Sequence, residues 1–242
     1  MMSLPRIRQV VLITDDLAAA SAQARELFGF TGGVSLDEEM AKLGFEHVIF
    51  SFADTFVEVV SPLDPASPHG RMLERNGPGG YMVVVQVDDV PALVDRAAGL
   101  GFAPIMNEDY HGAPLTQWHP KHLGTLAEID QVSPPESWHF APAVFEQCSP
   151  DVARDIVAAS LVADDPSGLA STWADLLVRE APQDGVVRLA RGETLTILPA
   201  DGGPRGLRSV DVVAADPARV GDAVELCGVT FRFVAPSPQE QS

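Results

Sequence analysis

The chain has 242 residues, 46% of them hydrophobic, and carries 16 Lys and Arg against 34 Asp and Glu, a formal charge of −18. This length suits one large domain or two small ones with a sizeable core. The negative charge repels phosphate backbones and anionic lipid headgroups, so we expect neither a nucleic-acid partner nor a membrane partner. No apolar run approaches the roughly 20 residues that span a bilayer, and we expect a cytoplasmic protein.

One local pattern occurs four times along the chain. Each copy begins with a strand-like apolar run, and the four runs are Ile7–Thr14, Met82–Val87, Ile156–Val162 and Leu207–Val213. Each run is followed by an aspartate that predicts a helix N-cap, namely Asp16, Asp89, Asp165 or Asp216. Apolar residues three or four apart then predict a helix in every copy, including a fourth helix with Val220 and Val224 on one face.

Glycines predict where three of these helices end. Gly29, Gly101 and Gly228 each follow the apolar helix pattern and suit the left-handed C′ position, whereas the third helix ends near Val178. Further strand-like runs follow the helices: His47–Phe52, Thr55–Val60, Leu126–Val132, Val186–Leu189, Thr194–Leu198 and Phe231–Val234. The repeating unit is therefore a strand, a helix, and two or three more strands.

A unit of this size cannot cover both faces of its own sheet. Four units average about 60 residues each, so we expect the first to pair with the second and the third with the fourth. The proline-containing segment between the pairs predicts a boundary. We therefore divide the chain into a domain at 1–134, a linker at 135–150 that we call the strap, and a domain at 151–242. We expect Trp138 and Phe140 to pack the strap back onto the protein.

Four stretches carry a resemblance to a known superfamily. Residues 7–17 (IRQVVLITDDL), 56–62 (FVEVVSP), 79–89 (GGYMVVVQVDD) and 124–129 (GTLAEI) resemble the vicinal oxygen chelate superfamily, which includes glyoxalases, epimerases, extradiol dioxygenases and bleomycin-resistance proteins. The resemblance covers most of residues 4–132 and rests on the repeat alone in 151–236. It implies an α+β fold in which four βαβββ-type units pair into two consecutive glyoxalase-like open barrels, the second degenerate.

The resemblance also implies a metal site in the first barrel. In the superfamily, the ligands come from the first and last strands of each unit, which here gives Gln9, Glu58 and Glu128, with Met82 where His is expected. Three oxygen donors suit a divalent ion such as Zn, Mn, Mg, Ni or Fe, whereas a thioether is a soft, weak ligand for hard ions. A site that has lost the metal is the alternative. The same offsets in the second half give no set of metal ligands.

A second group of candidates precedes the last strand of the second unit. His119, Lys121 and His122 stand where loops edge the barrel mouth, and they could receive an anionic substrate group or shuttle a proton. The alternative is a solvated turn. Pro120 argues against a regular helix at this position.

Two functions from different classes remain open. The first is a glyoxalase-like or epimerase-like enzyme, a lyase or isomerase acting on a small oxygenated metabolite or thioester. Glu58 or Glu128 would be its proton-transfer carboxylate, Gln9 a polariser or ligand, and Met82 part of the pocket lining. The second is a non-catalytic small-molecule binding protein of the bleomycin-resistance type, which Met82 favours. In both cases we expect a small-molecule partner, and a homodimer is possible in either.

Overall fold

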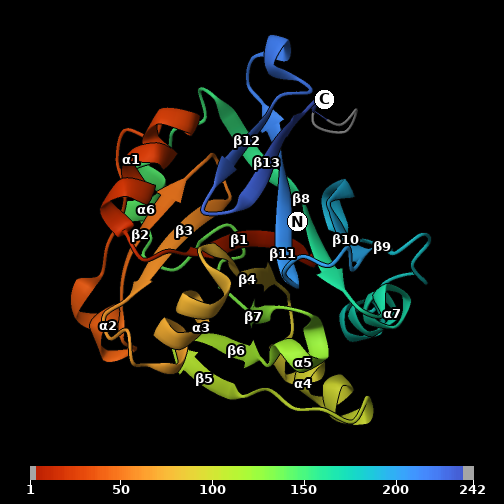
Figure 1. Ribbon diagram of the computed structural model, residues 1–242. Helices are drawn as coiled ribbons and strands as arrows, with labels where there is room; N and C mark the ends of the chain where they lie inside the picture. The colour runs from red at the N-terminus through yellow and green to blue at the C-terminus, as the bar shows by residue number, and fades with distance from the viewer. Residues whose placement is uncertain (1–3, 237–242) are drawn as a thin grey trace.

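The computed structural model describes residues 4–236 and contains two β-sheets with helices packed against them (Figure 1). The seven strands of sheet A are β1 (Arg6–Ile13), β2 (Phe45–Ser51), β3 (Phe56–Pro62), β4 (Gly79–Gln86), β5 (Met106–Tyr110), β6 (Ala113–Trp118) and β7 (Leu126–Asp130). The six strands of sheet B are β8 (Ala153–Ala163), β9 (Val186–Arg188), β10 (Thr194–Pro199), β11 (Gly206–Ala214), β12 (Ala223–Leu226) and β13 (Val229–Val234).

Short and medium helices connect the strands. The α-helices are α1 (Leu17–Phe28), α2 (Asp37–Lys42), α3 (Pro68–Asn76), α4 (Val90–Gly99), α5 (Pro120–Leu123), α6 (Ala143–Glu146) and α7 (Pro166–Leu177), and two 3-10 helices are η1 (Ala190–Gly192) and η2 (Pro217–Arg219). Among residues 4–236, none of these helices has the length and apolar character needed to cross a bilayer.

The strand order confirms the predicted pairing of units. Sheet A has the order β2-β3-β1-β4-β7-β6-β5, and sheet B has the order β12-β13-β11-β8-β10-β9. In every unit the opening strand runs parallel to the closing strand: β1 with β3, β4 with β7, β8 with β10 and β11 with β13. The two opening strands of each pair meet antiparallel at the centre of the sheet. The fold is thus two glyoxalase-like pairs of units in succession.

Three of the predicted N-cap aspartates cap helices as expected. The side chains of Asp16, Asp89 and Asp165 each accept a hydrogen bond from the backbone N–H three residues later, at the start of α1, α4 and α7. Gly29 ends α1 in the left-handed conformation, and Val178 ends α7 in the same conformation without a glycine.

The predicted fourth helix is wrong. Asp216 caps only the three-residue η2, and Val224 lies in the strand β12. Cys227 and Gly228 both have positive φ and join β12 to β13 in a two-residue hairpin turn, with Leu226 paired to Val229. Gly228 therefore permits a hairpin rather than ending a helix, because this short loop needs two consecutive residues with positive φ.

Sheet A is buried on both faces. One face, with Val10, Val59 and Val85, belongs to a large apolar core that continues through α1, α4 and α7 into sheet B. The other face packs against Trp138 and Val144 of the strap, and we call it the strap face. Gly80 marks a close approach of the sheets, since a Cβ there would lie 2.4 Å from the Leu207 carbonyl oxygen of β11. The division at 134 and 150 stays a prediction.

A polar junction joins the two halves at the beginning of β1. Arg6 and Arg8 are fully buried, and both form ion pairs with Asp54. Glu193, which precedes β10, accepts a hydrogen bond from the Ile7 backbone N–H at 2.7 Å. Burial raises the pKa of Glu193 from 4.5 to about 8.

This pKa predicts how the junction responds to pH. The folded state binds a proton on Glu193 more tightly than the unfolded state does, so the wild type loses stability as the pH rises from about 4.5 to about 8. Glu193→Gln keeps an oxygen for Ile7 and does not ionise. The stability of the variant relative to wild type should therefore increase with pH, by up to about 1.4 kcal/mol per pH unit in that range.

Urea unfolding of both proteins at pH 5, 6, 7 and 8 measures this difference. The exposed Glu180→Gln is the control for removing one negative charge. A difference between Glu193→Gln and wild type that stays constant with pH would contradict the prediction.

Candidate functional site

The register of the central strands places four of the sequence-predicted residues on the strap face. Val11 of β1 is paired with Glu58 of β3 and with Met82 of β4. In the same way, Val84 of β4 is paired with Glu128 of β7 and with Gln9 of β1. Because side chains alternate along a strand, Gln9, Glu58, Met82 and Glu128 all lie on the face that carries Val11 and Val84. A pseudo-twofold relation between the units exchanges Gln9 with Met82, and Glu58 with Glu128.

Glu58 is held by two hydrogen-bond donors. Gln9 Nε2 donates to Glu58 Oε2 at 2.7 Å, and His47 Nδ1 lies 2.6 Å from Glu58 Oε1. His47 Nε2 accepts the Leu36 backbone N–H at 2.8 Å, so Nδ1 carries the imidazole proton and donates it to Glu58. Trp138 Nε1 donates to Gln9 Oε1 at 3.2 Å, which fixes the orientation of the Gln9 amide. These contacts form one continuous chain from β2 to the strap.

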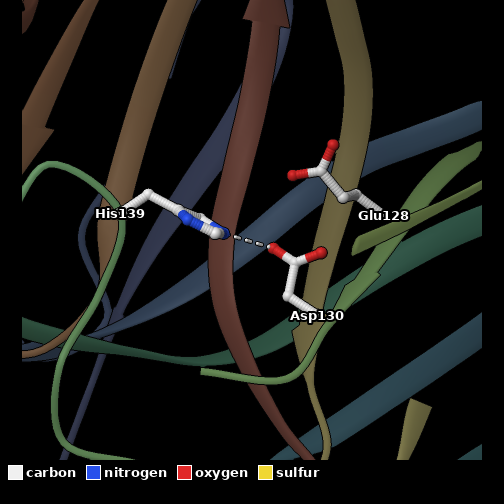
Figure 2. Close-up of side chains that lie close together, drawn as sticks. All are labelled: Glu128, Asp130 and His139. Atoms are coloured by element: carbon white, nitrogen blue, oxygen red, sulfur yellow. Dashed lines mark hydrogen bonds and ion pairs between the residues drawn. The ribbon is translucent and has the colours of Figure 1, made fainter. Parts of the chain in front are cut away.

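Glu128 belongs to a different cluster (Figure 2). Ligand atoms of Glu128, Asp130 and His139 all lie within 4.8 Å of one another. His139 Nε2 is 2.9 Å from Asp130 Oδ2, and Gln117 Nε2 donates to Glu128 Oε2 at 2.7 Å. Asp130 is fully buried, and its Oδ1 has no hydrogen-bond partner among residues 4–236. Glu128 is half-buried.

The electrostatics of this cluster favour a bound positive charge. Burial, together with the negative charge of Asp130, raises the pKa of Glu128 well above its ordinary value. Burial also raises the pKa of Asp130 and lowers that of His139, the latter against the attraction of Glu128. Two adjacent carboxyl groups out of water are stabilised by sharing a proton or by binding a cation. Two carboxylates and an imidazole are suitable ligands for a divalent ion, so the residues fit a metal.

The structure therefore divides the predicted ligand set. Gln9 and Glu58 lie together, but they bond to each other, to His47 and to Trp138. Glu128 is turned toward Asp130 and His139. Met82 is buried among apolar residues of the strap face.

His119, Lys121 and His122 lie elsewhere. Contrary to expectation, they form a short helix, α5, because Pro120 stands at its first position, where no backbone N–H is needed. His119 Nδ1 caps this helix by accepting the Lys121 N–H, and the His122 ring stacks on Phe102. In the part of the chain that the structure describes, none of the three contacts Gln9, Glu58 or Glu128.

Sequence reasoning gave His47 and His139 no role in the site, as single histidines without matching partners, and did not consider Asp130. The sequence did contain a signal for Asp130: it stands two residues after Glu128 in a predicted strand, so the two side chains are expected on the same face. His47 and His139 had none, because their partners are 11 and 9 residues away in sequence and meet them only in the folded chain. A cavity of about 690 Å³ opens beside β2, lined by residues including Asp16, Ser35 and His47. It lies between α1 and α2 rather than at the Glu128 cluster.

Comparison with known proteins identifies related sequences and folds. The family model described as a glyoxalase-like domain matches residues 10–177. An ethylmalonyl-CoA/methylmalonyl-CoA epimerase from Cereibacter sphaeroides is 32% identical over 133 residues, which are 52% of this chain and 98% of that protein. Human mitochondrial methylmalonyl-CoA epimerase is 28% identical over 134 residues, which are 53% of this chain and 75% of the human protein.

Two solved structures share the architecture of both halves. A mutant of 4-hydroxymandelate synthase from Streptomyces coelicolor superposes with a TM-score of 0.71 at 17% identity, covering 89% of this chain and 72% of that one. A hypothetical protein from Staphylococcus aureus has a TM-score of 0.68 at 13% identity, covering 96% of this chain and all of that one. At these identities the likeness concerns the fold.

The contacts of Trp138 predict how strongly the strap is held. Its ring stacks on Phe56 at a centroid distance of 5.9 Å, in addition to the hydrogen bond to Gln9. Trp138→Phe should cost about 1–3 kcal/mol of unfolding free energy, because it removes the N–H donor to Gln9 and part of the ring volume. Trp138→Ala should cost about 3–5 kcal/mol, because it also removes a buried ring. Urea unfolding measures both, and an alanine variant as stable as wild type would show that the strap does not pack here.

Proposed function

Because the chain belongs to the glyoxalase-like domain family, we propose that it is an enzyme that moves a proton at a carbon next to a carbonyl group. The substrate would be a small oxygenated metabolite or a thioester. The proposal is supported by one observation above all: the register places Glu58 and Glu128 at equivalent positions of the two units, on the same face of sheet A. Two carboxylates that face one substrate from related strands suit the removal and return of a proton.

Glu128 is the better candidate for the proton-transfer group. It is half-buried and therefore reachable, whereas Glu58 is only 9% exposed and both of its oxygens already accept hydrogen bonds. Glu58 then orients Gln9, whose second amide N–H is left to polarise a carbonyl oxygen. A divalent ion, when bound, would stabilise the negative charge that develops on that oxygen.

The strap decides how a substrate reaches this face. Trp138 packs on Phe56 and Gln9, so a ligand must enter beside the strap or displace it. A large thioester would keep its carrier group outside and present only the acyl end to Glu128. A cytoplasmic location and a homodimer stay predictions from the sequence.

Proton exchange in D₂O tests the proposal directly. Methylmalonyl-CoA, ethylmalonyl-CoA and the hemithioacetal of methylglyoxal with glutathione are each incubated with the protein, and NMR follows the loss of the proton next to the carbonyl group. We expect wild type to exchange at least one of these substrates, and Glu128→Gln to lose about 100-fold or more in rate. Glu108→Gln, at an exposed position on β5, is the matched control and should keep the rate.

The second candidate function is a binding protein without catalysis, which the apolar Met82 at the expected histidine position favours. If calorimetry shows that one of the three compounds binds, but none of the three exchanges its proton, the result would support this function and contradict the first. Equal exchange rates in wild type and Glu128→Gln would remove Glu128 from the role proposed.

A further inference from the structure

The cluster on β7 and the strap holds one buried and one half-buried carboxyl group, Asp130 and Glu128, with little to balance their charge. Glu128 and Asp130 are two residues apart on one strand, so both side chains leave the same face of sheet A. Among residues 4–236, no Lys or Arg forms an ion pair with either, and His139 is the partner of Asp130. Buried carboxylates are costly unless they are paired, protonated or bound to a metal.

The unpartnered oxygen of Asp130 points to a ligand. Asp130 has no exposed surface, and no amide, imidazole or hydroxyl donor of the described residues bonds to its Oδ1, which leaves the neighbouring Glu128 carboxyl group or a bound ion to satisfy it. Figure 2 shows the three side chains grouped around one point, with the Asp130 carboxyl group bonded to the His139 ring and the Glu128 carboxyl group beside both. A cation placed there would contact one atom from each of the three side chains, which lie within 4.8 Å of one another.

From this geometry we propose that Glu128, Asp130 and His139 form a divalent-cation site in which the strap supplies the imidazole. The distance of 2.9 Å between His139 Nε2 and Asp130 Oδ2 already suits two ligands of one ion, since ligands about 2.1 Å from a metal and at right angles lie about 3 Å apart. Glu128, with a carboxylate oxygen within 4.8 Å of both, supplies the third ligand. Carboxylates suit Mn²⁺ and an imidazole suits Zn²⁺, so either ion fits.

The neighbouring residues hold the ligands in place. The His139 ring contacts the rings of Trp138 and Tyr110, at centroid distances of 4.8 and 5.5 Å. Gln117, on the adjacent strand β6, donates to Glu128 Oε2. Such partners orient metal ligands and increase affinity.

The proposed site differs from the one that the superfamily resemblance implied, with ligands from β1, β3, β4 and β7. Met82 offers only a thioether, the Gln9 amide oxygen already accepts from Trp138, and Glu58 is engaged by Gln9 and His47. Glu128 would be the single residue common to both arrangements. The proposed site is therefore formed by β7 and the strap, and its imidazole comes from His139.

Binding of Mn²⁺ to the full chain, freed of metal with a chelator, tests the site without any substrate. The electron paramagnetic resonance signal of free Mn²⁺ falls as the ion binds, which gives affinity and stoichiometry. We expect one site per chain, with affinity reduced tenfold or more in His139→Ala and in Asp130→Asn. His122→Ala, which removes a histidine stacked on Phe102, is the matched control and should bind like wild type.

Gln9→Leu separates the two possible positions of the ion. If the ion binds at the proposed site, Gln9→Leu acts only through the lost hydrogen bond to Trp138, so it should bind the ion no more weakly than Trp138→Phe does. Loss of binding in Gln9→Leu with full binding in His139→Ala would overturn the proposal, and so would the absence of stoichiometric binding in wild type.

Melting temperatures show whether a variant loses Mn²⁺ binding because it is misfolded. Asp130→Asn removes a buried charge at constant shape, so it should fold, and Mn²⁺ should raise the melting temperature of wild type but not of this variant. Equal stabilisation of both would count against the site. Both proposals use Glu128, but because this experiment contains no substrate, a failure of metal binding can be told apart from a failure of proton exchange.

Discussion

The burial of sheet A on both faces is the constraint on which the rest of the structure depends. One face is covered by the core shared with sheet B, and the other by the strap. Polar side chains buried on such a sheet have no access to water, so each of them needs a partner inside the protein. The chain from Leu36 through His47, Glu58 and Gln9 to Trp138 satisfies this requirement on one side of the strap face. Asp130 has a hydrogen-bond partner for only one of its two oxygens, and in this its cluster differs from the chain around Glu58.

The strap connects these two polar groups. Its consecutive residues Trp138 and His139 contact different partners, Gln9 and Asp130, which lie on strands from different units. A movement of the strap would therefore change the surroundings of Glu58 and Glu128 together. The strap is both the cover of the face and a source of functional groups, which gives a physical reason for two adjacent aromatic side chains in a short connecting segment.

The second half has the same topology as the first but a different role. Sheet B pairs its opening and closing strands as sheet A does, yet its inward residues such as Leu161, Val210 and Phe231 are apolar. It covers sheet A and fixes the start of β1 through Glu193. The duplicated fold thus places the polar site in one half and much of the supporting core in the other.

The sequence alone determined the repeating unit and the pairing of units, and the superfamily resemblance implied that Gln9, Glu58 and Glu128 belong to one site. The repeating unit follows from period-two alternation and from aspartate caps, which act over a few residues and are visible in any one copy. The same local reasoning failed at the fourth helix, where apolar spacing resembled a helix but Cys227 and Gly228 formed a hairpin turn. Pairing of β12 with β13 outweighed the weak helical pattern.

Only the tertiary structure decided which partners each site residue has. Alternation and strand register place Glu58 and Glu128 on one face of sheet A. They do not determine side-chain rotamers, and they do not show that the strap folds back over this face. His47 reaches Glu58 across a strand pair, and His139 reaches Asp130 because the strap folds back over the sheet. The contacts of a buried carboxyl group depend on side chains brought together by packing, and packing involves the whole chain at once.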